Sequence, residues 1–476
     1  MYKSKILKIV VLMIIVGIVA SFSLFGCKVE AEEATEEVTE ETIEEVTEET
    51  IEEEAEEEEV AEEAPKLGTE GLTYWIDKAG ITPSGELTIY SYKDEGVTEW
   101  KIAQKYAETY PDVTINWVGT PYTDYANKIL LECQTGTQAF DVFWCNSFWS
   151  TTFHDYLEDV TDRIPEELRN DISPGIISCI AYKDAWYGAP IFISTGSVVY
   201  NKDMLKQAGY DTPPTTWDEF FKCAEDLVID KDNDGIPEVH GYTGLVGEPG
   251  YFLMYPVFLE SVGGHFWNKD EENPQPMFNS DEGKRALQIL KRLYMSDFSD
   301  PVMLTADDMS TRRSIASGKV AMGIECVGSV DSVVRNDFPE NEGVLGWSVV
   351  PSDPGYDSWS FDGSMGFAMS KGANIDAALG YILFYSSPEM QKFMTEDYGF
   401  PSARISLAED EEYVADYPFV PTAVEQVKNT DKYIAENVGM VQGSFFPIFE
   451  NYFMGKINEE TALSQMEDAF NEAWEE

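Results

Sequence analysis

A short acidic loop near the middle of the chain has the ligand spacing of a calcium site. Carboxylates stand at the first, third, fifth and ninth positions of a loop that begins at Asp230, and Gly235 occupies the sixth, where an EF-hand loop turns tightly. The twelfth position is Gly241, so the usual bidentate glutamate is absent and a remote carboxylate must replace it. We expect a structural Ca²⁺ ion, and an acidic turn without metal is the alternative. The expected ligands are Asp230, Asp232, Asp234, the carbonyl of Ile236 and Glu238.

A second group of candidate site residues follows directly after three predicted strands. Residues 86–91 and 113–117 alternate polar and apolar side chains, as half-buried strands do, and residues 140–144 form a short apolar run. Helical spacing in residues 97–110 and 122–135 separates these strands. The β-α-β-α-β order predicts an α/β fold with a parallel sheet, and ligands of such sheets lie beyond the carboxyl ends of the strands. The site segments predicted in this way are 92–95, 119–122 and 144–149.

The charge of the chain is strongly negative and unevenly distributed. The 476 residues carry a formal net charge of −56, and residues 28–65 contain 20 glutamates against a single lysine. This leaves about −40 on residues 66–476, a body large enough for one two-lobed domain or for two domains. A body this acidic, with no basic stripe in its sequence, argues against nucleic-acid binding.

The N-terminus has the features of an export signal. Three lysines precede an apolar run at residues 9–20 that is short for a membrane-spanning helix. Leu24-Phe25-Gly26-Cys27 resembles the processing box of bacterial lipoproteins, which implies cleavage before Cys27 and a diacylglyceryl group on its sulfur. We therefore assign residues 1–26 to a signal peptide and residues 27–65 to a lipidated cysteine with an acidic, disordered tether. An uncleaved membrane anchor is the alternative, and both place the body outside the cytoplasm.

Signatures of catalysis and of cysteine-based metal sites are absent from the sequence. It contains no G-x-S-x-G elbow, no P-loop and no G-x-G-x-x-G, and its three histidines are widely separated. The cysteines after Cys27 are odd in number and lack metal-ligand spacing, which predicts small buried side chains and leaves one or two disulfides open. They are Cys133, Cys145, Cys179, Cys223 and Cys326.

Three motifs follow one another in the middle of the chain: Tyr-Gly-Ala-Pro at 187–190, Tyr-Asn-Lys-Asp-Met-Leu at 200–205 and Pro-Pro-Thr-Thr-Trp-Asp-Glu-Phe at 213–220. Together they resemble the extracellular solute-binding proteins of family one, the maltose-binding-protein-like receptors of ABC importers, and they are the most specific match to it. In the last of these, Thr216 and Glu219 also predict a capping box. The resemblance covers roughly residues 85–476. Further matching segments are 208–209, 318–322, 361–367, a helix at 377–391, and 399–404.

The resemblance implies a two-lobed periplasmic-binding-protein-like fold of type II. The chain would cross between the lobes near 193–198, 343–347 and 398–403. Solute would bind in the interlobe cleft without covalent chemistry, and the importer's transmembrane subunits would recognise the closed form. This implies a monomeric receptor with no catalytic residues and no organic cofactor. The N-terminal lobe would hold residues 85–194 and 346–398, and the C-terminal lobe residues 197–343 and 402–476.

Carbohydrate is the ligand class that the resemblance implies. Aromatic rings pack on the apolar faces of sugars, whereas carboxylates, amides and hydroxyls bond to their edges. In the N-terminal lobe the expected contacts are Tyr92, Asp94, Glu95, Trp144, Asn146, Ser147, Tyr187, Trp359, Asp362 and Ser364. In the other lobe, Phe445 and Phe446 stand where the family usually has an aromatic platform. Glu325 stands where the family often has the tryptophan of a Gly-x-Trp ligand contact, so a stacking platform is missing at that second position.

Several of these residues have other interpretations. Trp144 could belong to the core, and Asp362 could cap a turn beside Gly363. Tyr251, Tyr255 and Trp267 could line the second lobe, although packing is the preferred reading of the last two and of Trp149. The ligand could also be a polyamine or another small solute, bound through cation–π contacts and ion pairs. An extracellular carbohydrate-active enzyme and a sensor subunit are the remaining alternatives.

Overall fold

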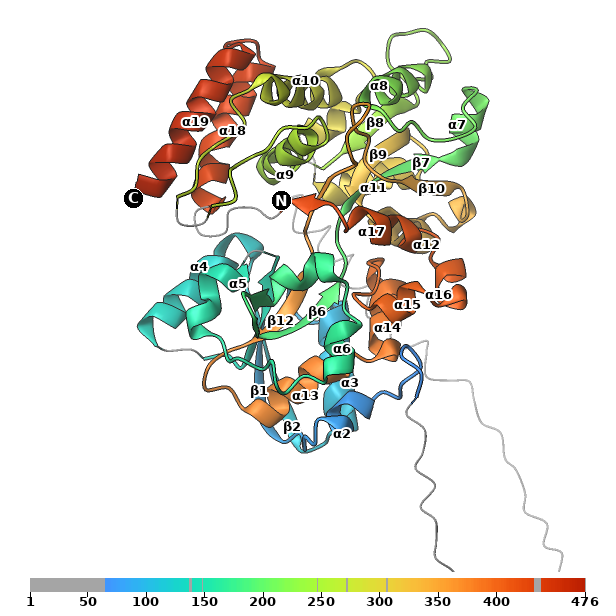
Figure 1. The fold of residues 1–476 in the computed structure, drawn as a ribbon. Helices are drawn as coiled ribbons and strands as arrows, with labels where there is room; N and C mark the ends of the chain where they lie inside the picture. Colours follow the sequence, from blue (N-terminus) through green and yellow to red (C-terminus); the bar gives the residue numbers. More distant parts are fainter. Residues whose placement is uncertain are drawn as a thin grey trace, which may run out of the picture. The chain divides into compact units, whose positions relative to one another are not determined.

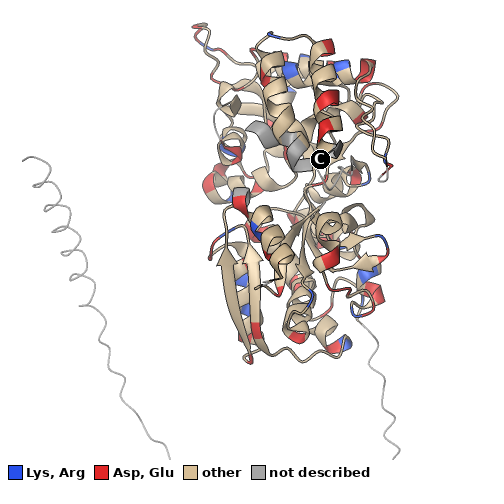
Figure 2. Cartoon of the chain, turned by 90° about the vertical axis from the view of Figure 1, so that its left-hand side faces the viewer, with Lys and Arg blue, Asp and Glu red and all other residues tan. Residues whose placement is uncertain are grey.

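The structure, a computed structural model of the chain, describes residues 65–136, 139–147, 149–245, 247–270, 273–304, 307–431 and 438–475. The predicted signal peptide, Cys27 and the acidic tether up to residue 64 lie outside the described residues. Within the described part of the chain, no helix is both long and apolar enough to span a membrane. Lysine and arginine are interspersed with the more numerous acidic residues over the elements (Figure 2).

The first of two large sheets confirms the predicted β-α-β-α-β order. Its strands, in the order in which they pair, are β2 (Val113–Gly119), β1 (Gly85–Ser91), β3 (Val142–Asn146), β12 (Met365–Met369) and β6 (Gly188–Phe192). β1 is parallel to both β2 and β3, and the connections contain α3 (Thr98–Thr109) and α4 (Tyr122–Thr135). β12 is antiparallel to β3 and to β6. Figure 1 shows this late strand, in orange, among the blue and green elements of the first half.

The third strand begins two residues later than its apolar run predicts. The Asp141 carboxylate accepts hydrogen bonds from the backbone N–H groups of Thr88 (2.7 Å) and Asn374 (2.8 Å). The Asp141 side chain thus takes the place of a backbone carbonyl as the partner of the Thr88 N–H at the start of β3, and regular strand pairing begins at Val142. The predicted helix at 377–391 is likewise divided into α13 (Ile375–Tyr385) and α14 (Pro388–Tyr398), because Ser387 caps a new helix that begins at a proline.

The second sheet has four strands and a separate hydrophobic core. In pairing order they are β10 (Leu345–Ser348), β7 (Gly196–Asn201), β9 (Val320–Cys326) and β8 (His240–Gly244). The predicted capping box is confirmed at the start of α8 (Trp217–Asp226), where Thr216 and Glu219 exchange side-chain to backbone hydrogen bonds. The other large helices of this half are α9 (Gly247–Glu260), α10 (Asp281–Met295), α11 (Asp308–Ala316), α12 (Ser329–Asp337), α18 (Val438–Phe453) and α19 (Glu459–Glu475).

Shorter elements complete the described chain. The helices are α2 (Tyr74–Lys78), α5 (Trp149–Phe153), α6 (Glu166–Asn170), α7 (Lys202–Gln207), α15 (Ile405–Ala408), α16 (Glu411–Asp416) and α17 (Val420–Gln426). The strands are β4 (Ala181–Tyr182), β5 (Ala185–Trp186), β11 (Ser360–Phe361) and β13 (Thr430–Asp431). β4 pairs with β5, and β11 pairs with β13.

Three segments that run between the two sheets lie side by side, and we call residues 192–196, 360–364 and 399–404 the crossing segments. Phe192 bridges Ser402, and Thr195 bridges Asp362. The first connects β6 to β7 and overlaps the crossing expected near 193–198, and the third connects α14 to α15 and overlaps the one expected near 398–403. The second was expected at 343–347, but β10 still pairs with β7 through Ser348, because buried Leu345 belongs to the second half. That crossing therefore comes later, between β10 and β12.

The chain after the third crossing segment packs differently from the expected second lobe. Ala403, Leu407 and Phe419 share a small core cluster with Ile172 and Ile176, which come from the first half of the chain. Among the described residues after this segment, those that are buried in the main core of the second half lie in α18 and α19. This small cluster therefore lies at the junction, next to the crossing segments.

Candidate functional site

Two aromatic rings from neighbouring strands of the first sheet stack on each other, one directly after the end of β1 and one from the middle of β3. The rings of Tyr92 and Trp144 are 4.2 Å apart between centroids and inclined by 13°. Tyr125 of α4 fixes this arrangement, since its hydroxyl donates to the Tyr90 backbone carbonyl and accepts from the backbone N–H of Trp144, both at 2.9 Å. Trp144 is only 1% exposed, whereas Tyr92 is half-buried. Trp144 thus belongs to the core, and Tyr92 carries the accessible part of the stack.

The ammonium group of Lys93 lies at the side of this stack, which sequence reasoning did not predict. Its Nζ is 5.1 Å from the ring centroids of both Tyr92 and Trp144 and 3.8 Å from that of Tyr398, whose hydroxyl it also contacts. The distance to Tyr398 is that of a cation–π contact, whereas the equal distances to the two stacked rings place the ammonium near their edges. We call these three rings the aromatic cage. Asp94 and Glu95, in the same predicted segment, are exposed.

A fully buried carboxylate lies near the cage. Glu99, in the first turn of α3, is 0% exposed, and neither of its side-chain oxygens has a hydrogen-bond partner among the described residues. The Tyr381 hydroxyl donates to the Glu99 backbone carbonyl at 3.4 Å. Burial raises the pKa of Glu99, and the charge of Lys93 opposes this shift. In the sequence, Glu99 lies at the start of a predicted helix, and nothing there marks it as a buried carboxylate or a candidate site residue.

The predicted residues Asn146, Ser147 and Asp362 come together beside the crossing segments. The Ser147 hydroxyl donates to the Asp362 carbonyl at 2.6 Å, and the Ser147 N–H donates to Asn146 Oδ1 at 2.7 Å. The Asp362 carboxylate accepts from the Ser178 hydroxyl at 3.1 Å and from the Ser364 N–H at 3.0 Å. The last bond is the local turn that the alternative reading of Asp362 expected. We call these five residues the Asp362 cluster.

Two further predicted contacts of the first half lie apart from this cluster. Tyr187 is 6% exposed and belongs to the first core. Trp359 is half-buried, and the ammonium of Lys269 lies 5.6 Å from its ring centroid. The side chain of Tyr187 is therefore a packing element in this structure, whereas Trp359 keeps an accessible face.

In the second half, the carboxylate of Glu325 is hydrogen-bonded to other side chains of the protein. Its carboxylate, 1% exposed, accepts from the Thr311 hydroxyl at 2.8 Å and from Nε of Arg312 at 3.2 Å. Burial raises its pKa to about 7, although Arg312 favours the charged form. As placed here, Glu325 reaches a ligand only through these partners.

The two predicted platform residues on α18 differ in their environments. Phe445 is 0% exposed and packs against Phe252, Phe266 and Phe278 in the second core, so it offers no face for a ligand in this structure. Phe446 is half-buried and stacks on Tyr251, with centroids 5.9 Å apart. Tyr255 and Trp267 lie in the same core as Phe445. Of these second-half residues, Phe446 therefore keeps the accessible ring, whereas Tyr251, 6% exposed, belongs to the core.

The acidic loop gathers its carboxylates as a metal site requires. Oxygen atoms of Asp230, Asp232 and Asp234 lie within 4.8 Å of one another. The loop closes through hydrogen bonds from the N–H of Gly235 to Asp230 (3.0 Å) and from the N–H of Ile236 to Asp234 (2.8 Å), with Gly235 at φ 86°. Asp230 Oδ1 is buried and has no hydrogen-bond partner among the described residues. The donor set fits a hard cation such as Ca²⁺. Glu238 instead accepts from the Lys231 N–H.

Comparison with known proteins agrees with this arrangement. A family model described as bacterial extracellular solute-binding protein matches residues 90–392. A probable amino-acid ABC transporter periplasmic-binding protein of Sinorhizobium fredii is 24% identical over 326 residues, which are 66% of this chain and 71% of that protein. The maltotriose-binding protein of Pyrococcus abyssi is 24% identical over 310 residues, 63% of this chain and 62% of that protein. The structure of maltose-bound MalE3 from T. maritima aligns with a TM-score of 0.69 at 20% identity, over 80% of this chain and 98% of that one, which confirms the two-lobed fold.

Proposed function

Since the chain belongs to the family of bacterial extracellular solute-binding proteins, we propose that it captures a carbohydrate and delivers it to the membrane subunits of an ABC importer. The carbohydrate would be a mono- or oligosaccharide, bound between the two halves, and the protein would perform no chemistry on it. The observation that carries the proposal is the Tyr92–Trp144 stack beside the Asp362 cluster.

The chemistry of these groups suits a sugar. The accessible ring of Tyr92 offers a flat apolar face for the C–H groups of a pyranose. Hydroxyl, amide and carboxylate groups from Ser147, Asn146 and Asp362 lie at the adjacent strand end, each at most 7% exposed. On binding they would exchange their internal hydrogen bonds for bonds to sugar hydroxyls. The maltose- and maltotriose-binding relatives support the same ligand class.

A calorimetric panel on the full chain in detergent tests this proposal. Maltose, maltotriose and mannitol represent the proposed class, and spermidine and a mixture of amino acids represent the competing classes. We expect a sugar or polyol to bind with an affinity that changes little with salt, because no ion pair forms. Mass spectrometry of the released ligand should return it unchanged, which separates a receptor from an enzyme. Binding of spermidine or an amino acid alone would overturn the carbohydrate assignment.

We also propose that a lipid on Cys27 holds this receptor at the outer face of the cell membrane. The support is the processing box and the acidic stretch that follows it. Cells fed an alkynyl fatty acid should label the wild-type chain, whereas Cys27→Ala should be unlabelled and released from the membrane fraction. Equal labelling of both would contradict the proposal.

We further propose that the loop beginning at Asp230 binds a structural Ca²⁺ ion. Three gathered carboxylates repel one another without a cation, so metal binding should stabilise the fold. Calcium should raise the melting temperature, and a chelator should reverse this effect. Asp232→Asn should lose it, whereas Asp112→Asn, an exposed acid just before β2, should keep it. A melting temperature that does not change with calcium would contradict this proposal.

A further inference from the structure

Residues 65–84 form an N-terminal arm that precedes β1 and the matched family region. α2 lies within the arm and packs Trp75 and Ile76, each 1% exposed, into the first hydrophobic core. Glu70, on the approach to α2, has a fully buried side chain. Burying a carboxylate is costly unless a cation and hydrogen bonds compensate it, so the arm must have a specific partner.

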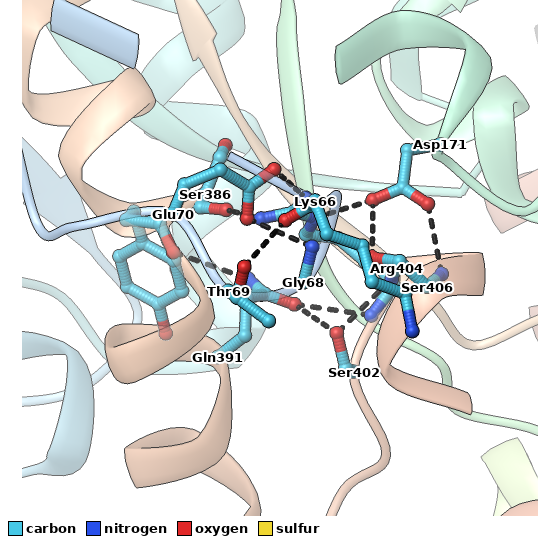
Figure 3. Close-up of polar contacts among 12 residues, drawn as sticks. Lys66, Gly68, Thr69, Glu70, Asp171, Ser386, Gln391, Ser402, Arg404 and Ser406 are labelled. Atoms are coloured by element: carbon cyan, nitrogen blue, oxygen red, sulfur yellow. Dashed lines mark hydrogen bonds and ion pairs between the residues drawn. The ribbon is translucent and has the colours of Figure 1, made fainter. Parts of the chain in front are cut away.

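The partner is Arg404, which is also fully buried (Figure 3). Its Nη2 donates to Glu70 Oε1 at 2.7 Å, its Nε donates to Asp171 Oδ2 at 2.6 Å, and its Nη1 donates to the Ser386 carbonyl at 3.2 Å. The guanidinium also lies 5.6 Å from the ring centroid of Trp75. The second oxygen of Glu70 accepts from the Gly68 N–H at 2.9 Å. The arm therefore contacts Arg404 through both an ion pair and a ring.

Arg404 is the last residue of the third crossing segment, residues 399–404. Upstream of it, Gln391 accepts hydrogen bonds from the Ser402 hydroxyl and the Ala403 N–H, and the Pro401 carbonyl accepts from the Ile193 N–H. The start of the segment touches the second half, since a Cβ atom on Gly328 would lie 1.9 Å from the Gly399 carbonyl oxygen. One end of the segment thus meets the second half, and the other is held by the arm.

We propose that Glu70 is a positioning residue of the hinge, through which the N-terminal arm clamps the third crossing segment to the first half. This rests on the proposed function, because a hinge matters only if the two halves close on a solute. With Glu70 in place, the segment is already ordered before the solute arrives. Without it, closure must also order the segment, and binding weakens by the corresponding entropy.

The selective perturbation is Glu70→Ala, because Arg404 keeps its ion pair with Asp171 and is not left as an orphaned charge. Removing Asp171 would be less informative, since its oxygens also accept from the N–H and hydroxyl of Ser406. Glu167→Ala is the matched control. It removes an exposed ion pair of the same arm, with Lys78 at 2.8 Å, and does not touch Arg404.

Hydrogen exchange and electron-spin distances on the full chain test the clamp. Spin labels at the exposed positions Leu131 and Met295 report the separation of the two halves. We expect Glu70→Ala to speed amide exchange in residues 399–406 at least tenfold, to broaden the ligand-free distance distribution, and to weaken solute binding about fivefold or more. Glu167→Ala should match the wild type in all three.

Two outcomes would overturn the proposal. One is unchanged exchange and unchanged distances in Glu70→Ala, whatever happens to thermal stability. The other is equal changes in Glu167→Ala, which would indicate a general loosening of the arm. If Glu70→Ala does not fold, Glu70→Gln keeps the shape and removes the charge, and the same exchange and distance changes are expected in it. If no solute binds the wild type, the proposed function fails while exchange and distances still decide the clamp.

Discussion

The buried carboxylate of Glu325 makes a definite prediction about pH and stability. It is bound by Thr311 and Arg312, and burial raises its pKa from an ordinary value of 4.5 to about 7. One pKa unit corresponds to about 1.4 kcal/mol, so this shift is worth about 3 kcal/mol of folding free energy. Since domains are stable by only about 5–15 kcal/mol, a change of this size is readily measured.

The sign follows from proton linkage. The folded chain holds the Glu325 proton more tightly than the unfolded chain does, so the contribution to stability is fully present below pH 4.5. It is lost as the pH rises through 7. The free energy of unfolding of the wild type should therefore fall by about 3 kcal/mol between pH 4.5 and 8 because of this residue. Glu325→Gln has no proton to release and should lack this fall.

Urea unfolding followed by tryptophan fluorescence at several pH values between 5 and 8 measures the effect. The quantity to compare is the wild-type free energy minus that of Glu325→Gln, since other titrating groups cancel in this difference. Glu167→Gln is the control, because its exposed carboxylate pairs with Lys78, which lowers its pKa and moves its titration below this window. A Glu325→Gln difference that stays constant with pH would refute the reasoning.

Three other substitutions test separate parts of the site. Tyr92→Ala should weaken sugar binding about tenfold in calorimetry, because the accessible ring of the stack is lost, whereas Tyr356→Ala, at an exposed position before β11, should bind normally. Lys93→Ala removes the ammonium and most of the side chain from the aromatic cage and should create measurable binding of tetramethylammonium, since such a cage is worth about 1–2 kcal/mol for a cation; no gain over the wild type would show that the rings alone do not attract one. Phe449→Ala empties a fully buried position and should lower the free energy of unfolding by about 3–5 kcal/mol, with a smaller loss for half-buried Phe446→Ala; equal losses would contradict the assigned burial.

The sequence predicted best those features that depend on neighbouring residues. The alternation in β1 and β2, the helix between them and the capping box at Thr216 are all local patterns. Because a βαβ connection forces parallel pairing, these patterns also placed Tyr92 and Trp144 at the same edge of the sheet. The proximity of the two residues therefore follows from the sequence, whereas the stacking of their rings was not predicted.

Helix rotation and strand assignment near the junction were harder to predict. Phe445 and Phe446 are consecutive on one helix, so their side chains point about 100° apart, and only one of them could face the core. Nothing in their types distinguishes them, and the structure buries Phe445. Similarly, β10 is too short for its pattern to reveal which sheet it joins. Because it pairs with β7, the second crossing lies between β10 and β12 and not at 343–347.

Charged partners were beyond prediction because they come from distant parts of the chain. The ring nearest to the Lys93 ammonium, that of Tyr398, is 305 residues away, and Glu70 is separated from Arg404 by 334 residues. Tyr398 is the last residue of α14, and Arg404 is the last residue of the third crossing segment that follows it. A hinge segment must contact both halves, so it gathers side chains whose spacing in sequence carries no signal. Sequence reasoning therefore brought Tyr92 and Trp144 to one region of the first sheet, whereas the charged partners of Tyr398 and Arg404 emerge only when the crossing segments are in place.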